Sequence, residues 1–166
     1  MAGARAPFTG ASDHLVSEAL YLDDLDALGI ELYRDRPRDA WPPPDPGERI
    51  KMDTLPLDLN ALAAEAEGDG SGVRIGHVHL KVADVDAATD FWTREVGLDL
   101  MTSWAGQAAF LSVGGYHHHI GVNAWYSLGA GPEPPERPGL DAVVLGGTGR
   151  DEELRTPDGL RVVLEP

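Results

Sequence analysis

Histidines are concentrated in two short segments of this sequence, and histidine serves proteins both as a transition-metal ligand and as an acid–base group. Residues 73–82 (VRIGHVHLKV) alternate in polarity, which predicts a strand with His77 and His79 on one face. Three consecutive histidines follow at 117–119. A carboxylate, Glu31, lies in the apolar segment GIELY. Imidazole and carboxylate together are a donor set for a divalent transition metal.

The first half of the chain is expected to position Glu31 on a hairpin. The pattern predicts two strands, over residues 14–23 and 29–34, after a loose N-terminal stretch 1–13. A proline-rich linker without regular structure is expected next. A short helix is then expected within 53–66, with Asp58 as its N-cap.

The second half is expected to position the histidines on a β-α-β-β-β unit. After the strand 73–82, Asp84 is a suitable N-cap for a helix that ends at Gly97. Three strand-like runs follow, LDLMTSW, AAFLSVG and HHHIGVNAW. The tail holds three more short strand-like segments, and no helix fits between residues 145 and 151.

Composition excludes several classes of function. There are no cysteines, so disulfides, thiolate metal sites and cysteine nucleophiles are absent. The formal charge of −15 disfavours nucleic acid and anionic membranes, because phosphates would be repelled. No apolar run reaches the roughly 20 residues that a membrane span needs, and MAGARAPFTG lacks the apolar core of a secretory signal. We therefore expect a cytoplasmic protein.

The segments from IGHVHLKVADVDAATDFWTREVGLDL through GGYHHHIGVNAW resemble the vicinal-oxygen-chelate superfamily of glyoxalases, bleomycin-resistance proteins and extradiol dioxygenases. More narrowly, the chain is similar to catechol-2,3-dioxygenase-like proteins, whose second module ends much as DHLVSEALYLDDLDALGIELYRDRPRDAW does. Relative to that four-module pattern the chain looks trimmed. The resemblance implies an α+β fold of paired βαβββ modules that form a curved mixed β-sheet cup.

This resemblance also implies a domain order. We expect a partial N-terminal module, a proline-rich linker with a short helix, a complete βαβββ module and a shortened β-rich module. Their expected ranges are 1–36, 37–72, 73–128 and 129–166.

Two metal ligands follow from the resemblance. The family commonly takes one from a Gly-His pair on a first strand, which matches His77, and one from a Glu after a turn, which matches Glu31. The C-terminal repeat has Val163 and Ala142 where the equivalent ligands would stand. A third ligand is therefore not assigned by the usual positions, and His14 is an alternative source for it.

Further residues are predicted to line the site. The resemblance favours His119 as an acid–base group beside the metal and Tyr21, ten residues before Glu31, as a catalytic residue near the substrate. The predicted strand faces add three residues that line the substrate: His79, His117 and Asn123. The alternative is that these are polar strand edges, a hairpin end and an ordinary half-buried tyrosine.

The function implied is that of a metal-dependent enzyme that cleaves a catecholic ring in the manner of extradiol dioxygenases, with Fe(II) favoured and Mn, Zn or Ni possible. The alternatives are a non-catalytic binding or resistance protein of the same fold and a glyoxalase-like isomerase. We expect a small-molecule substrate. We also expect a homodimer, with strands or modules exchanged between chains, because a chain with one complete module leaves strand edges open.

Overall fold

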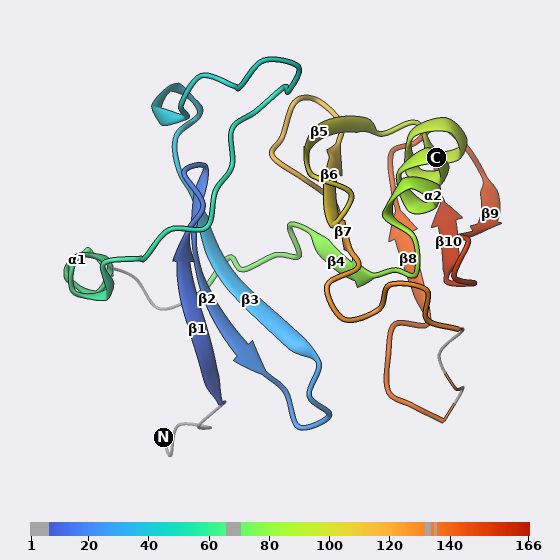
Figure 1. Cartoon of the computed structure of the whole chain (residues 1–166), viewed down its shortest axis with the longest axis horizontal. Coiled ribbons are helices and arrows are strands. Elements are labelled where there is room, and N and C mark those ends of the chain that lie inside the picture. Colours follow the sequence, from blue (N-terminus) through green and yellow to red (C-terminus); the bar gives the residue numbers. More distant parts are fainter. Residues whose placement is uncertain (1–6, 66–70, 132–133, 135) are drawn as a thin grey trace. The chain divides into compact units, whose positions relative to one another are not determined.

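The computed structural model describes residues 7–65, 71–131, 134 and 136–166. By its internal contacts the chain divides into an N-terminal unit, Met1–Gly76, and a C-terminal unit, His77–Pro166. Each unit is described by itself (Figure 1).

The N-terminal unit is built on a three-stranded antiparallel sheet in the order β1-β2-β3. Its strands are β1 (Phe8–Asp13), β2 (Ser17–Asp23) and β3 (Gly29–Asp35). The prediction of a loose stretch over residues 1–13 is wrong for β1, because pairing with β2 holds a segment of weak strand propensity extended. The predicted strand 14–23 begins only at Ser17, since Leu15 turns the chain with a φ of 70°.

Two short helices follow the sheet. A 3-10 helix, η1 (Arg38–Ala40), lies in the linker that was predicted to have no regular structure, so that prediction is wrong at this point. The predicted helix is confirmed as α1 (Leu59–Ala64). Asp58 caps it by accepting hydrogen bonds from the backbone N–H groups of Asn60 and Ala61. The last residue of the predicted range lies outside the described residues.

The C-terminal unit contains the predicted β-α-β-β-β order. Its four-stranded sheet has the order β4-β7-β6-β5, with β4 parallel to β7 and the other pairs antiparallel. The strands are β4 (Val78–Lys81), β5 (Asp99–Trp104), β6 (Ala108–Ser112) and β7 (Ile120–Asn123). The strand predicted over 73–82 is shorter than expected because β7 offers it only four residues to pair with.

One helical segment covers the apolar face of this sheet. It begins with α2 (Val85–Asp90), capped by the Asp84 side chain, and continues as a π-helical segment, η2 (Phe91–Val96). Gly97 ends it with a φ of 93°. Fully buried Trp92 belongs to the same hydrophobic core as residues of β6 and β7.

The tail forms a second, three-stranded sheet in the order β8-β10-β9. Its strands are β8 (Ala142–Leu145), β9 (Glu152–Arg155) and β10 (Arg161–Leu164). Val143, Val162 and Leu164 join the same hydrophobic core as α2. The predicted absence of a helix between β8 and β9 is confirmed for the described residues, and the α+β fold class is confirmed. In the described part of the chain no helix has the length and apolar character to cross a membrane.

Candidate metal centre

Three histidines of the C-terminal unit converge on one point. His77, His79 and His118 each offer a ring nitrogen, and these nitrogens all lie within 4.8 Å of one another. The Nε2 atoms of His79 and His118 are 2.9 Å apart. His79 lies within β4, whereas His118 lies in the loop that enters β7 and is 3% exposed.

The parallel pairing of β4 with β7 brings these segments together. His79 lies directly opposite Gly121 in the register, and its ring occupies the space that a side chain there would take. A Cβ at Gly121 would lie 2.6 Å from Cε1 and 2.9 Å from Nε2 of the His79 ring. The absence of a side chain at residue 121 is therefore what admits His79 to the site.

Backbone hydrogen bonds hold the histidine loop between two strands. The N–H of His119 donates to the carbonyl oxygen of Leu111 on β6 at 2.8 Å, and the N–H of Val78 on β4 donates to the carbonyl oxygen of His119 at 2.9 Å. His118 is thus fixed at a loop position that is clamped on both sides.

Aromatic rings form the surroundings of the three histidines. The ring of buried Phe110 on β6 lies 5.9 Å from that of His79 and 5.1 Å from that of His118, centroid to centroid. The ring of Trp104 lies 5.0 Å from that of Phe110, and half-exposed Trp125 stacks on Trp104 at 6.4 Å, centroid to centroid. An apolar wall beside the imidazoles lowers the local dielectric and strengthens electrostatic interactions there.

The donor set fits a divalent transition metal. Imidazole nitrogens suit zinc, copper, iron and nickel, and they bind zinc at about 2.0–2.1 Å. The Nε2 atoms of His79 and His118, 2.9 Å apart, are close enough for one ion to be held by both. Within the C-terminal unit, the described residues add no carboxylate to this cluster of three histidines.

The other predicted residues of this unit lie close by. The Nδ1 atom of His117 lies 2.7 Å from Nδ1 of His118, and that of His119 lies 2.8 Å from Oγ of Ser112. Burial, with a smaller contribution from His77, lowers the pKa of His119. Asn123 is buried, and its Oδ1 has no hydrogen-bond partner in the described part of the chain.

Of the histidines brought together here, His118 is the one that sequence reasoning missed. Strand alternation was used to orient residues 117–119, but β7 begins only at Ile120, so the alternation does not extend to them. The three adjacent histidines at 117–119 were themselves a usable signal. In a strand, three consecutive residues always place at least one side chain on each face.

The predicted residues of the N-terminal unit form a separate group. Tyr21 and Glu31 are direct partners across β2 and β3. Nδ1 of His14 donates to the backbone carbonyl oxygen of Asp53 at 2.7 Å, which leaves Nε2 to accept from the Tyr21 hydroxyl at 2.5 Å. Burial, and then the charge of Glu31, raises the pKa of Tyr21. Tyr21, Glu31 and His14 therefore form one local group, and the catalytic role of Tyr21 stays a prediction.

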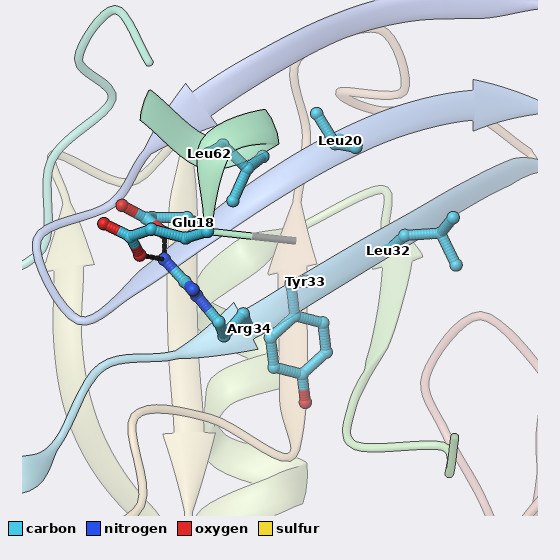
Figure 2. A pocket seen from close by; sticks show the side chains of 7 residues that line it. Glu18, Leu20, Leu32, Tyr33, Arg34 and Leu62 are labelled. Atoms are coloured by element: carbon cyan, nitrogen blue, oxygen red, sulfur yellow. Dashed lines mark hydrogen bonds and ion pairs between the residues drawn. The ribbon is translucent and has the colours of Figure 1, made fainter. Parts of the chain in front are cut away.

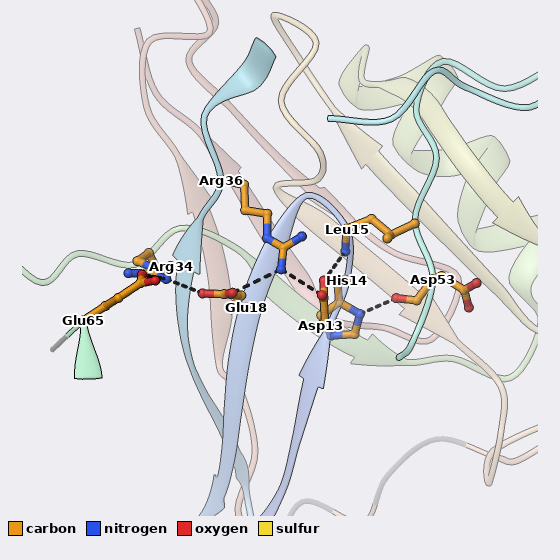
Figure 3. Close-up of polar contacts among 8 residues, drawn as sticks. All are labelled: Asp13, His14, Leu15, Glu18, Arg34, Arg36, Asp53 and Glu65. Carbon is orange, nitrogen blue, oxygen red and sulfur yellow. Dashed lines mark hydrogen bonds and ion pairs between the residues drawn. The ribbon is translucent and has the colours of Figure 1, made fainter. Parts of the chain in front are cut away.

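The opposite face of this sheet holds a pocket of about 350 Å³ between the strands and α1 (Figure 2). It is lined by Glu18, Leu20, Leu32, Tyr33, Arg34, Leu62 and Glu65. Arg34 forms ion pairs with Glu18 and Glu65, and Arg36 bridges Glu18 and Asp13 (Figure 3). Strand alternation places Leu20 and Leu32 on the face away from Glu31, so this pocket is separate from the Tyr21 group.

His77 and Glu31, the two ligands implied by the resemblance, lie in different units. The structure gives each of them a different local environment, imidazoles for His77 and a tyrosine for Glu31. Their joint binding of one ion stays a prediction.

Comparison with known proteins adds an independent line of information. No family model matches the chain. A catechol-2,3-dioxygenase of Bacillus subtilis (strain 168) is 44% identical over 144 residues, which cover 82% of this chain and 50% of that protein. The chain thus spans about half the length of this curated relative. With its βαβββ module and this degree of identity, the chain belongs to the vicinal-oxygen-chelate superfamily.

Solved structures with partial similarity include a possible glyoxalase from Bacillus cereus, with a TM-score of 0.43, 16% identity, and coverage of 56% of this chain and 98% of that one. A lactoylglutathione lyase from Agrobacterium tumefaciens has a TM-score of 0.40 and 14% identity, with coverage of 58% of this chain and 96% of that one. A 2,2',3-trihydroxybiphenyl 1,2-dioxygenase from Sphingomonas wittichii strain RW1 has a TM-score of 0.30 and 15% identity, with coverage of 96% of this chain and 62% of that one.

Proposed function

We propose that the chain forms part of a metal-dependent vicinal-oxygen-chelate enzyme that cleaves the ring of a catecholic substrate as extradiol dioxygenases do. The observation that carries the proposal is the convergence of His77, His79 and His118 in the superfamily's βαβββ module. The 44% identity to a catechol-2,3-dioxygenase supports the choice of substrate class.

The three histidines would hold the ion, and Fe(II) is the ion proposed for ring cleavage. Bound there, the metal would supply a Lewis acid with positions open to two neighbouring substrate oxygens. Phe110 would exclude water from one side of the histidines. His119, held by Ser112, is the residue proposed to move protons, and Glu31 is the proposed carboxylate ligand.

The test is anaerobic reconstitution with Fe(II), addition of a catechol, and then exposure to O2. Ring cleavage produces a new visible chromophore, whereas binding alone produces none. Wild-type protein should give the chromophore, and His118→Ala should not, because it removes one of the three nitrogens. Stoichiometric Fe(II) and bound catechol without any chromophore would contradict the dioxygenase proposal.

A second candidate is supported by the convergence of the three imidazoles themselves. Three neutral imidazoles also bind zinc in enzymes that use it as a Lewis acid. A glyoxalase-like isomerase would need Zn(II) or Ni(II) and no O2. Turnover of a hemithioacetal by the zinc- or nickel-loaded protein, with no reaction of catechol by the iron-loaded protein, would favour this candidate.

A further inference from the structure

The two ring nitrogens of His118 have different neighbours. Nε2 lies 2.9 Å from Nε2 of His79, on the side where the three histidines meet. Nδ1 lies 2.7 Å from Nδ1 of His117. His117 is completely buried and His118 is 3% exposed, so this second contact lies inside the protein.

A neutral imidazole carries one proton, on either Nδ1 or Nε2. The position of this proton determines which nitrogen of His118 can donate a hydrogen bond and which can bind a metal. When Nε2 of His118 binds a metal, the proton must lie on Nδ1. That N–H then donates to Nδ1 of His117, whose own proton must lie on its Nε2. In the other tautomer His118 keeps its proton on Nε2, donates it to His79, and has no lone pair there for a metal.

We propose that His117 is a positioning residue that holds His118 in its metal-binding tautomer. This inference rests on the proposed function in one respect, namely that the three histidines bind the metal. Histidine ligands commonly donate their second N–H to a fixed acceptor, which orients the ring and raises its basicity. Here the acceptor is another histidine, itself packed 4.1 Å from the ring of Tyr116, centroid to centroid.

Substitutions of His117 test this role. His117→Phe keeps an aromatic ring and removes the acceptor, and it should weaken Zn(II) and Co(II) binding by about 10–100-fold, the usual effect of losing such a partner. His117→Asn keeps an acceptor close to the position of Nδ1 and should recover most of the loss. His119→Phe is the matched control from the same run, because its ring pairs with Ser112 and lies outside the three-histidine cluster.

Affinities are measured by competition with a chromophoric chelator, and the visible spectrum of Co(II) reports the number of ligands. Thermal melting of the metal-free variants separates lost binding from lost folding. A measurement on the wild type needs no substitution: long-range ¹H–¹⁵N spectra of the Zn(II)-loaded protein should show His118 protonated at Nδ1 and His117 at Nε2.

Three results overturn the inference alone. The first is a folded His117→Phe that binds metal as tightly as the wild type, and the second is a His118 ring protonated at Nε2 in the Zn(II)-loaded protein. Loss of metal by His119→Phe equal to that by His117→Phe would also overturn it, because the effect would then not be specific to the acceptor. Failure of the wild type to bind stoichiometric metal overturns the proposed function and, with it, this inference.

Discussion

Both units contain a three-stranded antiparallel meander, β1-β2-β3 in one and β5-β6-β7 in the other, and the two differ in what covers them. In the C-terminal unit β4 pairs along β7, and α2 packs on the apolar face. Leu111 and Ile120 on that face are at most 1% exposed. In the N-terminal unit the outer edge of β3 has no partner strand in the described residues, and Ile30 and Leu32 are 43% and 48% exposed.

This difference teaches that an alternating pattern predicts an apolar face but not its burial. Both meanders have such a face, and α2 buries it in the C-terminal unit, whereas α1 leaves Ile30 and Leu32 of the N-terminal face about half exposed. Exposed apolar faces and open strand edges favour association with other chains. The expected homodimer stays a prediction, and the β3 edge is where we expect its contact.

The largest effect that separates the two units is expected for metal binding. His118→Ala should abolish stoichiometric metal, because it removes one of three converging nitrogens. Glu31→Gln should weaken binding without abolishing it, because the three converging histidine nitrogens remain. Metal analysis of protein purified without chelator measures both. Equal loss in the two variants would mean that the ion is shared equally between the units, and unchanged binding in Glu31→Gln would remove Glu31 from the ligand set.

The next largest effect is expected for stability of the two apolar faces. Leu111→Ala should cost about 2–5 kcal/mol, because it leaves a cavity beneath α2. Leu32→Ala should cost much less, about 0.5 kcal/mol, since its side chain is already half exposed. Urea denaturation gives both values. A large cost for Leu32→Ala would show that this face is covered in solution, and its dependence on protein concentration would identify a second copy as the cover.

A substitution at Gly121 should have a smaller, local effect on the metal centre. Gly121→Ala places a methyl group within 2.9 Å of three atoms of the His79 ring, which must then move away from His118. We expect weaker Co(II) binding and a changed visible spectrum, with little change in thermal stability. Gly146→Ala is the control, because a Cβ there meets nothing within 4 Å. A Co(II) spectrum identical to that of the wild type would exclude His79 as a ligand.

The smallest effect is expected in the ionic network of the N-terminal unit. Burial raises the pKa of Glu18, but hydrogen bonds and charge from Arg34 and Arg36 outweigh it and lower the pKa overall. A carboxyl whose folded pKa is lowered stabilises the fold above its unfolded pKa, and that contribution is lost as the pH falls through the folded value. Glu18→Gln should cost about 0.2–1 kcal/mol at neutral pH and flatten the loss of stability below about pH 4.5.

Denaturation curves at neutral and acidic pH measure this effect. Asp141→Asn in the C-terminal unit is the comparison, because it removes one exposed partner of Arg161. It should change stability at neither pH. If the loss of stability at acidic pH is the same in Glu18→Gln as in the wild type, Glu18 contributes nothing to the pH dependence of the free energy of unfolding.

Much of the fold could be predicted from local signals. Asp58 and Asp84 cap helices as expected, Gly97 ends one, and the β-α-β-β-β order follows from period and turn residues. These features depend on neighbours within a few positions, so the sequence carries them directly. The resemblance also indicated the superfamily, which the comparison with a curated relative supports.

The composition of the metal centre depended on contacts far apart in the chain. His79 and His118 are 39 residues apart, and they meet only because the parallel register sets His79 opposite Gly121. The sequence determined that histidines would be available, but the strand expected to carry two of them, β4, carries only His79, and His77 lies directly before it. The tertiary structure decided that His118 would join them, because β7 begins at Ile120 and backbone bonds from His119 to β4 and β6 fix the loop before it. Register between distant strands is set by the packing of the whole sheet, and no local pattern specifies it.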